Sequence, residues 1–414
     1  MSAAAPRGLR EALGAALGLT PVGGPAGNVT VARGTLDGKP VHAALVENRA
    51  ASGSIGAVEA EKLAALFRVA ALERSRLVLY LDSAGAKVSE GLAALGAFRA
   101  LFRAGLDCAF SGAPVAAVLG RNCFGGSSML AHLARERLFG PATRLAMSGP
   151  AVIAAGSGMD PLDEMFRAMA EAAMSPAARA KANAANATWT PGTDLVAWLR
   201  EALAPGADPV AEFRARHDDL GARFPEPLGA PKWESVRRRD LEKIYPGGYE
   251  ARESGGLLEG LGRTGRSEES FLGLTGSAAL AADRAWRFAD AAWRHPGAGA
   301  LRVFLDCATH ATRLEEERLV LTEYVVDMSA ALAVAARRGA HVRLTIAGKA
   351  GGGVYVALAA PAERVSSVYG AEIHVLPGTA VAAILGSSRD ALPSFDDYRA
   401  ARVADEELKL GLVP

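Results

Sequence analysis

Two stretches of the chain each deliver adjacent glycines from an apolar segment to the start of a helix-like segment. The first is Pro114 to Arg137, PVAAVLGRNCFGGSSMLAHLARER, and the second is His341 to Ala360, HVRLTIAGKAGGGVYVALAA. Glycines leave backbone N–H groups unobstructed, and a helix N-terminus adds the positive end of its dipole. Such a turn can hold an anion or a developing oxyanion. The candidate catalytic residues are therefore Gly125, Gly126, Gly352 and Gly353.

Glycines also permit close packing of a helix on a strand, which is a sufficient explanation for one isolated pair. Here the pairs occupy equivalent points of a repeat. Leu77 to Asp82 (LVLYLD) and Leu301 to Asp306 (LRVFLD) are both apolar strands that end in aspartate. The interval from the aspartate to the glycine turn is about 43 positions in the first half and about 46 in the second, which indicates an internal duplication. The repetition favours paired oxyanion sites, and the default role of each aspartate is loop hydrogen bonding.

The remaining reactive side chains give little support to nucleophilic catalysis or to a metal site. Ser127 and Ser128 follow the first turn without a G-x-S-x-G frame, so they are expected to cap the helix rather than act as nucleophiles. No HxH or HExxH set occurs, so no metal site is predicted. The sequence also has no phosphate-binding loop and no dinucleotide fingerprint. His132 is expected to pack or to face solvent, and the run Glu315 to Glu317 is expected to form a solvated helix start.

The elements that must position the turns alternate between strand and helix. Val29 to Asn48 predicts a hairpin that turns at Asp37-Gly38. Helices are expected over 58–74 and 89–104, and strands over 77–82 and 115–119, with strand character again over 138–150. Such alternation predicts a largely parallel sheet.

The second half repeats this alternation of strands and helices after a long intervening segment. Residues 176–265 indicate a helical excursion and connector, with a glycine-rich loop over 244–265. A helix over 277–295, a strand over 301–306, a long helix over 315–338, a strand over 341–346 and a strand pair over 364–376 follow. The predicted division is an N-terminal helix and link (1–28), a first domain (29–175), the connector (176–265) and a second domain (266–414).

The length, composition and net charge of the chain argue against several classes of protein. The chain has 414 residues, half of them hydrophobic, and a formal net charge of +1, which gives no support to nucleic-acid binding. Neither a signal peptide nor a membrane span is expected. Cys108, Cys123 and Cys307 lie far apart, so no disulfide framework or zinc ribbon is predicted, and a cytoplasmic location is expected.

Several motifs resemble malonate decarboxylase subunits, which are relatives of acyl-CoA carboxylase carboxyltransferases. SGSIGAVEAEKL (52–63), LDSAGAKVSEG (81–91), VLGRNCFGGSSM (118–129) and AMSGPAVI (146–153) resemble the β subunit. VFLDCATHATRLEEERL (303–319), LTIAGKAGGGVYVAL (344–358) and EIHVLPGTAV (372–381) resemble the γ subunit. The match covers roughly residues 30–160 and 275–385, so the chain looks like a β–γ fusion.

The resemblance implies an α/β fold of two crotonase-like (ββα superhelix) domains in tandem, with the active site where they meet. It also implies decarboxylation of malonyl-acyl carrier protein. Gly125 and Gly126 would hold the thioester carbonyl as it becomes an enolate, and Gly352 and Gly353 would hold a second carbonyl. Further substrate-binding candidates in these motifs are Ser54, Gly85, Phe124, Gly149, Lys349, Gly351 and His374, although a structural role for His374 is the more common case.

The resemblance implies no covalently bound cofactor, only an acyl group on phosphopantetheine or CoA, with biotin possible only on a partner chain. Expected partners are an acyl carrier protein or CoA thioester and other decarboxylase subunits, and a homo-oligomer is expected. Cys307-Ala308-Thr309-His310 stands where γ-like subunits carry a Pro-Gly loop. Two alternatives stay open: a biotin-dependent acyl-CoA carboxyltransferase and a non-catalytic scaffold that binds a carrier protein.

Overall fold

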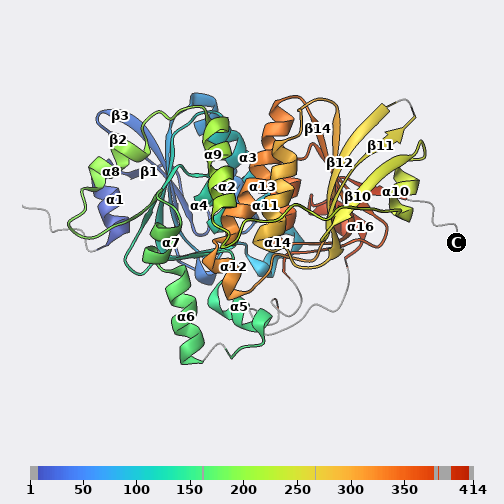
Figure 1. Cartoon of the computed structure of the whole chain (residues 1–414). Coiled ribbons are helices and arrows are strands. Elements are labelled where there is room, and N and C mark those ends of the chain that lie inside the picture. Colours follow the sequence, from blue (N-terminus) through green and yellow to red (C-terminus); the bar gives the residue numbers. More distant parts are fainter. Residues whose placement is uncertain (1–7, 161–162, 266, 377–380, 382–392, 410–414) are drawn as a thin grey trace, which may run out of the picture. The chain divides into compact units, whose positions relative to one another are not determined.

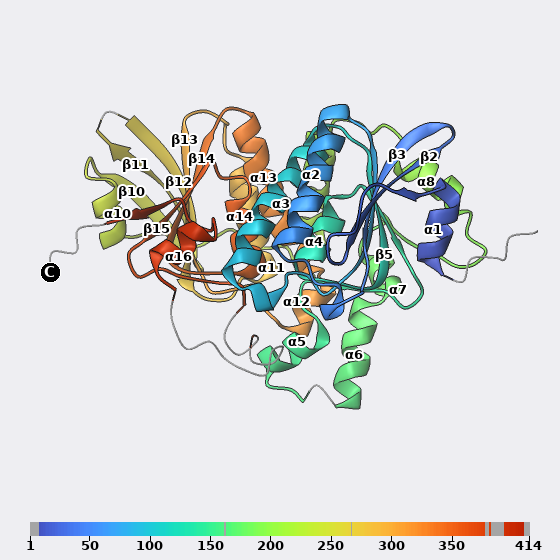
Figure 2. The same ribbon diagram turned by 180° about the vertical axis from the view of Figure 1, so that it is seen from behind.

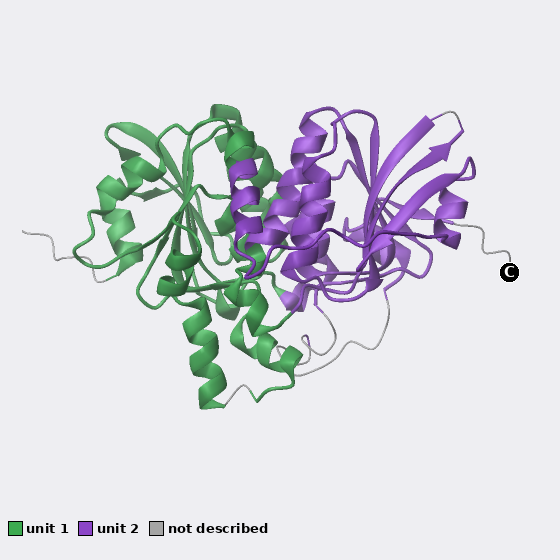
Figure 3. Cartoon of the chain, in the orientation of Figure 1, with its two compact units in different colours: residues 1–87, 100–212, 312–322 green, residues 88–99, 213–311, 323–414 purple. Residues whose placement is uncertain are grey.

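The computed structural model describes residues 8–160, 163–265, 267–376, 381 and 393–409, and its chain forms two compact units (Figures 1 and 3). Unit 1 comprises residues 1–87, 100–212 and 312–322, and unit 2 comprises residues 88–99, 213–311 and 323–414. Each unit contains one mixed sheet with helices. The expected α/β class with two domains is confirmed, since each unit has its own sheet. The boundaries at residues 28, 175 and 265 stay predictions.

The sheet of unit 1 begins with the predicted hairpin and continues in parallel. Its strand order is β1-β2-β3-β4-β5-β6-β8, with β7 also paired to β5. The pairs β1–β2 and β2–β3 are antiparallel and the others are parallel, as the strand–helix alternation predicts. The strands are β1 (Thr20–Pro21), β2 (Val29–Leu36), β3 (Lys39–Val46), β4 (Arg76–Ser83), β5 (Val115–Phe124), β6 (Glu136–Phe139), β7 (Arg144–Ala146) and β8 (Asn186–Thr188).

Helices cover both faces of this sheet (Figures 1 and 2). On one face, α1 (Leu9–Leu17) and α8 (Leu195–Ala202) bury Leu13 and Leu199 against strand residues such as Val41 and Val118. On the other lie α2 (Ala57–Glu73), α4 (Gly126–Leu133) and the second half of α3 (Leu92–Phe110). The remaining helices here are α5 (Pro150–Ser157), α6 (Glu164–Met174), α7 (Pro176–Ala182) and α12 (Leu314–Arg318), with 3-10 turns η1 (Ala51–Gly53) and, at the start of unit 2, η2 (Val88–Glu90).

The sheet of unit 2 joins an antiparallel part to a parallel part. Its order is β17-β15-β14-β13-β12-β11-β10-β9, with β16 also paired to β14. Strands β9 to β12 are antiparallel, and the pairs from β12 to β17 are parallel. The strands are β9 (Glu234–Ser235), β10 (Tyr249–Ser254), β11 (Leu257–Thr264), β12 (Ser267–Ser277), β13 (Ala300–Cys307), β14 (His341–Gly351), β15 (Arg364–Val368), β16 (Glu372–His374) and β17 (Glu406–Leu408).

Helices also lie on both faces of the second sheet (Figures 1 and 2). On one side are α11 (Ala282–Trp293), α13 (Leu321–Arg337) and α14 (Gly352–Ala359), and α10 (Arg239–Ile244) packs on the other through Leu241 and Tyr245. Further helices are α9 (Pro209–Ala222) and α16 (Phe395–Ala400). The single helix predicted over 315–338 is instead two helices, α12 and α13, because Val320 between them has a positive φ of 63°.

The prediction of a glycine-rich loop over 244–265 is wrong. Strands β10 and β11 pair there in full antiparallel register, from Tyr249↔Gly262 to Ser254↔Leu257. The glycines make room for aromatic rings on the sheet, because a side chain on Gly260 would collide with Phe271 and one on Gly262 with Tyr245. The frequent glycines of this segment therefore make room for aromatic rings that pack on the sheet, and they do not indicate a loop. Upstream in the same predicted connector, β8 pairs with β6 in the sheet of unit 1.

Candidate active site

The first glycine turn joins β5 to α4 through a backbone conformation that favours glycine. Gly125 has φ 54° and ψ −127°, outside the regions open to other residues without strain. Its N–H donates to the carbonyl oxygens of Ala146 (3.2 Å) and Met147 (3.1 Å). This N–H is therefore occupied within the fold. Gly126 is the first residue of α4, and no partner for its N–H is found among the described residues.

Gly85 brings a neighbouring loop close to this turn. It has φ 94°, and a Cβ there would lie 2.6 Å from the Phe124 carbonyl oxygen and 3.2 Å from the Gly126 nitrogen. A side chain at Gly85 would thus crowd the Gly126 N–H. The same loop is held to the chain before α2, since Ile55 N–H donates to Gly85 O at 2.8 Å.

Two serine hydroxyls hold the turn and are both buried. Ser127 Oγ donates to the carbonyl oxygens of Phe124 (2.8 Å) and Ser83 (3.0 Å), and Ser128 Oγ donates to Gly125 O (2.7 Å). The hydroxyls thus bind carbonyls and do not cap N–H groups as predicted. Buried and bonded in this way, neither serine is placed as a nucleophile.

A buried ion pair supports the strand end that receives the Gly125 N–H. Glu317 is fully buried, and its carboxylate accepts the N–H groups of Met147 (3.2 Å) and Ser148 (2.8 Å) and an N–H of Arg179 (3.4 Å). Arg179 also donates to Leu145 O at 2.8 Å. The prediction that the Glu315 to Glu317 run is solvated is therefore wrong for Glu317, and Glu316 is buried as well. The sequence held no signal for this pairing because its members are 138 positions apart.

The second turn has the same construction at the end of β14. The parallel register shifts between Leu81 and Ser83 in the first unit and between Leu305 and Cys307 in the second. After the shift Ser83 pairs with Cys123 and Cys307 with Ala350, so Gly125 and Gly352 each lie two residues further on. Gly352 has φ 49°, matching Gly125.

The aspartates that end the two apolar strands confirm the equivalence. Asp82 Oδ1 accepts the Asn122 N–H at 3.0 Å, and Asp306 Oδ1 accepts the Lys349 N–H at 2.9 Å. Both carboxylates therefore hold the strand segment just before a glycine turn, as their expected loop-bonding role requires. The internal duplication extends to single hydrogen bonds.

The second-half candidates gather around this turn. Gly351 is in register with His374 on β16, and His374 Nε2 lies 2.8 Å from Ala308 O, so this histidine is already engaged. Burial lowers the pKa of His374. Lys349 Nζ lies 3.7 Å from Glu372 Oε2 with both side chains half exposed, so the ammonium is reachable for an anionic group. Pro377 and Gly378, which follow in the sequence motif, lie outside the described residues.

The unusual segment Cys307 to His310 is buried in the second unit. Cys307 Sγ lies 3.1 Å from Ala278 O, and burial raises the pKa of this thiol to about 11. Burial lowers the pKa of His310 to about 4, so this imidazole is neutral at pH 7. Neither group is set up as a general acid or base at neutral pH.

The first-half candidates also lie near their turn, but through different contacts. The Ser54 hydroxyl is buried without a hydrogen-bond partner among the described residues. Gly149 immediately precedes α5, and a Cβ there would contact the Phe124 ring at 3.4 Å. The Arg144 guanidinium lies over that same ring, 5.7 Å from its centre. The structure thus brings Phe124 and Gly149 together beside Gly125.

Neither a metal site nor a membrane span emerges from the described part of the chain. No group of three or more His, Cys, Asp or Glu side chains there could hold a metal ion. No described helix combines the length and apolarity needed to cross a membrane.

Comparison with known proteins finds a family match within the first part of the chain. Residues 14–171, which contain the first glycine turn, match the carboxyl transferase domain. Over 153 residues the chain is 31% identical to the methylmalonyl-CoA carboxyltransferase 12S subunit of Propionibacterium freudenreichii subsp. shermanii. This match covers 36% of the present chain and 29% of that relative, so the shared part spans under a third of the relative.

Two solved structures are similar over longer stretches. A Pseudomonas malonate decarboxylase hetero-dimer is 28% identical, with 50% of this chain and 93% of that chain covered and a TM-score of 0.41. A transcarboxylase 12S structure, described as a hexamer assembly, is 19% identical, with 98% and 87% covered and a TM-score of 0.38.

Proposed function

We propose that this chain is a carboxyltransferase-type enzyme that decarboxylates a malonyl thioester, with malonyl-acyl carrier protein as the preferred substrate. The observation that carries the proposal is the match of residues 14–171 to the carboxyl transferase domain, because this stretch contains the strained Gly125 and the helix-starting Gly126.

The chemistry needs a site for negative charge rather than a nucleophile. When the bond between the α-carbon and the carboxylate breaks, CO2 leaves and the electron pair moves onto the thioester, forming an enolate. The Gly126 N–H, at the positive end of α4, donates to the enolate oxygen. A proton from solvent then adds to the α-carbon and gives the acetyl thioester. Gly125 fixes the turn, since its own N–H is bound to Ala146 and Met147.

The second turn takes the corresponding role for a second carbonyl or carboxylate. Gly352 supplies the positive φ, and the N–H of Gly353 in the first turn of α14 is the donor. Lys349 adds a positive charge near this turn. Substrate contacts at Ser54, Gly85, Phe124, Gly149, Gly351 and His374 belong to the same proposal.

A second candidate is a biotin-dependent acyl-CoA carboxyltransferase. The identity with a methylmalonyl-CoA carboxyltransferase subunit favours it. In that case the carboxyl group passes between the thioester and biotin on a partner chain, and the two turns keep their roles.

The experiment measures CO2 release from malonyl-CoA and from malonyl-carrier protein, each with and without biotin. Biotin-independent release that is fastest with the carrier protein supports the first proposal. Turnover only with biotin supports the second. Carrier binding without turnover in any of the four reactions contradicts both and identifies a scaffold.

Variants test the turns themselves. Gly126→Val and Gly353→Val place a side chain over the proposed donors without the burden of a positive φ, and each is expected to lower kcat by about 100-fold or more. Gly192→Val, in an exposed turn with open space around its Cα, is the matched control and keeps its activity. Full activity in folded Gly126→Val protein would exclude the first oxyanion site.

A further inference from the structure

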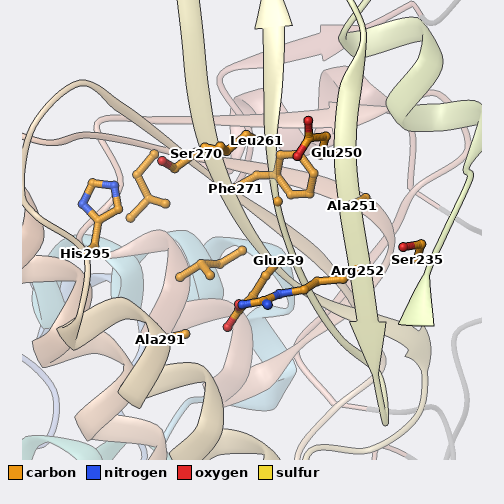
Figure 4. A pocket seen from close by; sticks show the side chains of 13 residues that line it. Ser235, Glu250, Ala251, Arg252, Glu259, Leu261, Ser270, Phe271, Ala291 and His295 are labelled. Atoms are coloured by element: carbon orange, nitrogen blue, oxygen red, sulfur yellow. The ribbon is translucent and has the colours of Figure 1, made fainter. Parts of the chain in front are cut away.

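Unit 2 contains a pocket of about 440 Å³ that the proposed reaction does not use (Figure 4). It lies over the antiparallel part of the sheet, at strands β9 to β12, beside the end of α11 and the start of β13. Strand pairing places Arg252 opposite Glu259 and Ser270 opposite Leu301. Side chains opposite each other share one face of a sheet, and Glu259 is also opposite Leu272, two residues from Ser270, so these side chains lie on the same face.

The pocket is separate from the second glycine turn. Leu301, which lines it, is in register with Val342 near the beginning of β14. Gly351 is the last residue of that strand, and nine residues of extended chain span roughly 30 Å. The pocket therefore lies toward the end of the parallel strands opposite to the glycine turn.

His295 lines this pocket and has one unused hydrogen-bond donor. The residue is 8% exposed, and its Nδ1 accepts the Gly297 N–H at 3.1 Å. Burial lowers its pKa, so the ring is neutral and its proton is on Nε2. Nε2 is buried and has no hydrogen-bond partner among the described residues. Burying a hydrogen-bond donor costs free energy unless another group accepts its hydrogen bond.

Glu259 lines the same pocket and has an unused acceptor. Its Oε2 accepts an N–H of Arg252 at 2.7 Å, while its buried Oε1 has no hydrogen-bond partner among the described residues. Arg294 lies 4.0 Å from Oε1, too far for a hydrogen bond, and pairs more closely with Asp290, at 3.2 Å. The Arg252 guanidinium is held over the Trp233 ring at 4.5 Å. In Figure 4, His295 lies on one side of the pocket and Glu259 with Arg252 on another.

From these contacts we propose that the pocket binds a small neutral molecule that has a hydrogen-bond acceptor at one end, a donor at the other and a hydrocarbon part between them. A carbonyl oxygen accepts from His295 Nε2–H, and a hydroxyl donates to Glu259 Oε1. The hydrocarbon part lies against Leu261, Leu272 and Leu301. The ligand is proposed to be neutral because the Glu259 carboxylate already pairs with Arg252.

The test titrates the full chain with 4-hydroxybutanamide, 5-hydroxypentanamide and 6-hydroxyhexanamide, since each has a carbonyl at one end and a hydroxyl at the other. Binding is followed by calorimetry and by the imidazole nitrogen shifts of His295. At least one member is expected to bind saturably and to shift the Nε2 resonance. Its methyl ether, which cannot donate to Glu259, is expected to bind about tenfold more weakly.

Variants locate the binding. His295→Phe is expected to weaken it about tenfold, and Ala291→Phe, which fills the pocket from α11, abolishes it. His341→Phe changes an exposed histidine of the same unit and is the control, with unchanged binding. Saturable binding that survives both pocket variants, or no binding by any of the three amides, would overturn the proposal. If Ala291→Phe does not fold, His295→Phe and the methyl ether still decide between these outcomes.

Discussion

Arg179 and Glu317 form an ion pair in which both side chains are almost completely buried, with 1% and 0% of their surface exposed. Burial raises the pKa of Glu317, while the Arg179 guanidinium and the N–H groups of Ser148 and Met147 act in the opposite direction. Because Met147 O in turn accepts the Gly125 N–H, this pair supports the peptide on which the first glycine turn rests.

Removing one member of this pair is expected to destabilise the protein strongly. Arg179→Met leaves a buried carboxylate without its countercharge, at a cost of about 3–5 kcal/mol. Urea denaturation measures the loss. The exposed pair Arg200–Asp37 is the control, and Arg200→Met is expected to change stability little. The double variant Arg179→Met/Glu317→Gln should lose less than the sum of the single losses, and strict additivity would contradict direct coupling.

Gly125→Ala is expected to show the effect of backbone strain separately from the effect of covering the Gly126 N–H. Its φ of 54° with ψ −127° disfavours alanine by about 1–3 kcal/mol, although the nearest atom to a new Cβ is 3.8 Å away. Lower stability with a loss of activity is therefore expected. Gly126→Ala, without a positive φ, should keep its stability. Equal stability of both variants in thermal denaturation would show that the turn adapts without strain.

His217 is buried between two carboxylates in unit 2. Its Nδ1 lies 2.7 Å from Asp327 Oδ2 and its Nε2 lies 3.6 Å from Asp290 Oδ1, while its ring stacks on Trp286. Burial lowers the pKa of His217, but the hydrogen bonds to Asp290 and Asp327 outweigh this and raise it to about 9. Trp293 Nε1 also donates to Asp327, at 2.9 Å.

The raised pKa of His217 predicts that this cluster weakens in alkali. A group whose pKa is higher in the folded state stabilises fully below its unfolded pKa of about 6.5, and this contribution is lost as pH rises through about 9. The free energy of unfolding is expected to fall by up to about 3 kcal/mol between pH 6.5 and 10. His217→Gln should flatten this profile, whereas the exposed control His341→Gln should not. An unchanged profile in His217→Gln would contradict the assignment.

The three cysteines are expected to resist thiol reagents in the folded protein. Burial raises the pKa of Cys108 and of Cys123 to about 12, and that of Cys307 to about 11. Little thiolate therefore exists at neutral pH, and all three sulfurs are buried. Ellman's reagent should label three thiols rapidly in denaturant but almost none without it. Rapid labelling of one cysteine in the native protein would locate a local opening.

Short-range patterns in the sequence were sufficient for much of the fold. The Asp37-Gly38 hairpin, the apolar strands that end at Asp82 and Asp306 and the glycine turns after β5 and β14 appear where they were predicted. Each depends on local rules of turn chemistry and hydrophobic spacing. The similar spacing from each aspartate to its glycine turn also indicates the internal duplication. The hydrogen bonds of Asp82 and Asp306 confirm it.

What the sequence could not supply depends on contacts between distant residues. Nothing in the Glu315 to Glu317 run distinguishes a buried carboxylate from a solvated one, because its partner Arg179 lies in a different helix. Gly260 and Gly262 resembled loop glycines because the rings of Phe271 and Tyr245 that occupy their space come from other elements. The site residues stay predictions for the same reason, since local motifs do not determine which donors a substrate reaches.

The assignment of residues 312–322 to unit 1 has a consequence for synthesis on the ribosome. That segment lies between two stretches of unit 2, and it carries the Glu317 carboxylate that binds Met147 and Ser148. Domains usually fold during translation from the N-terminus onward. Here the first unit cannot form its buried Arg179–Glu317 ion pair until the ribosome has made just over half of the second. A nascent chain stopped before residue 312 would therefore carry Arg179 without its buried partner.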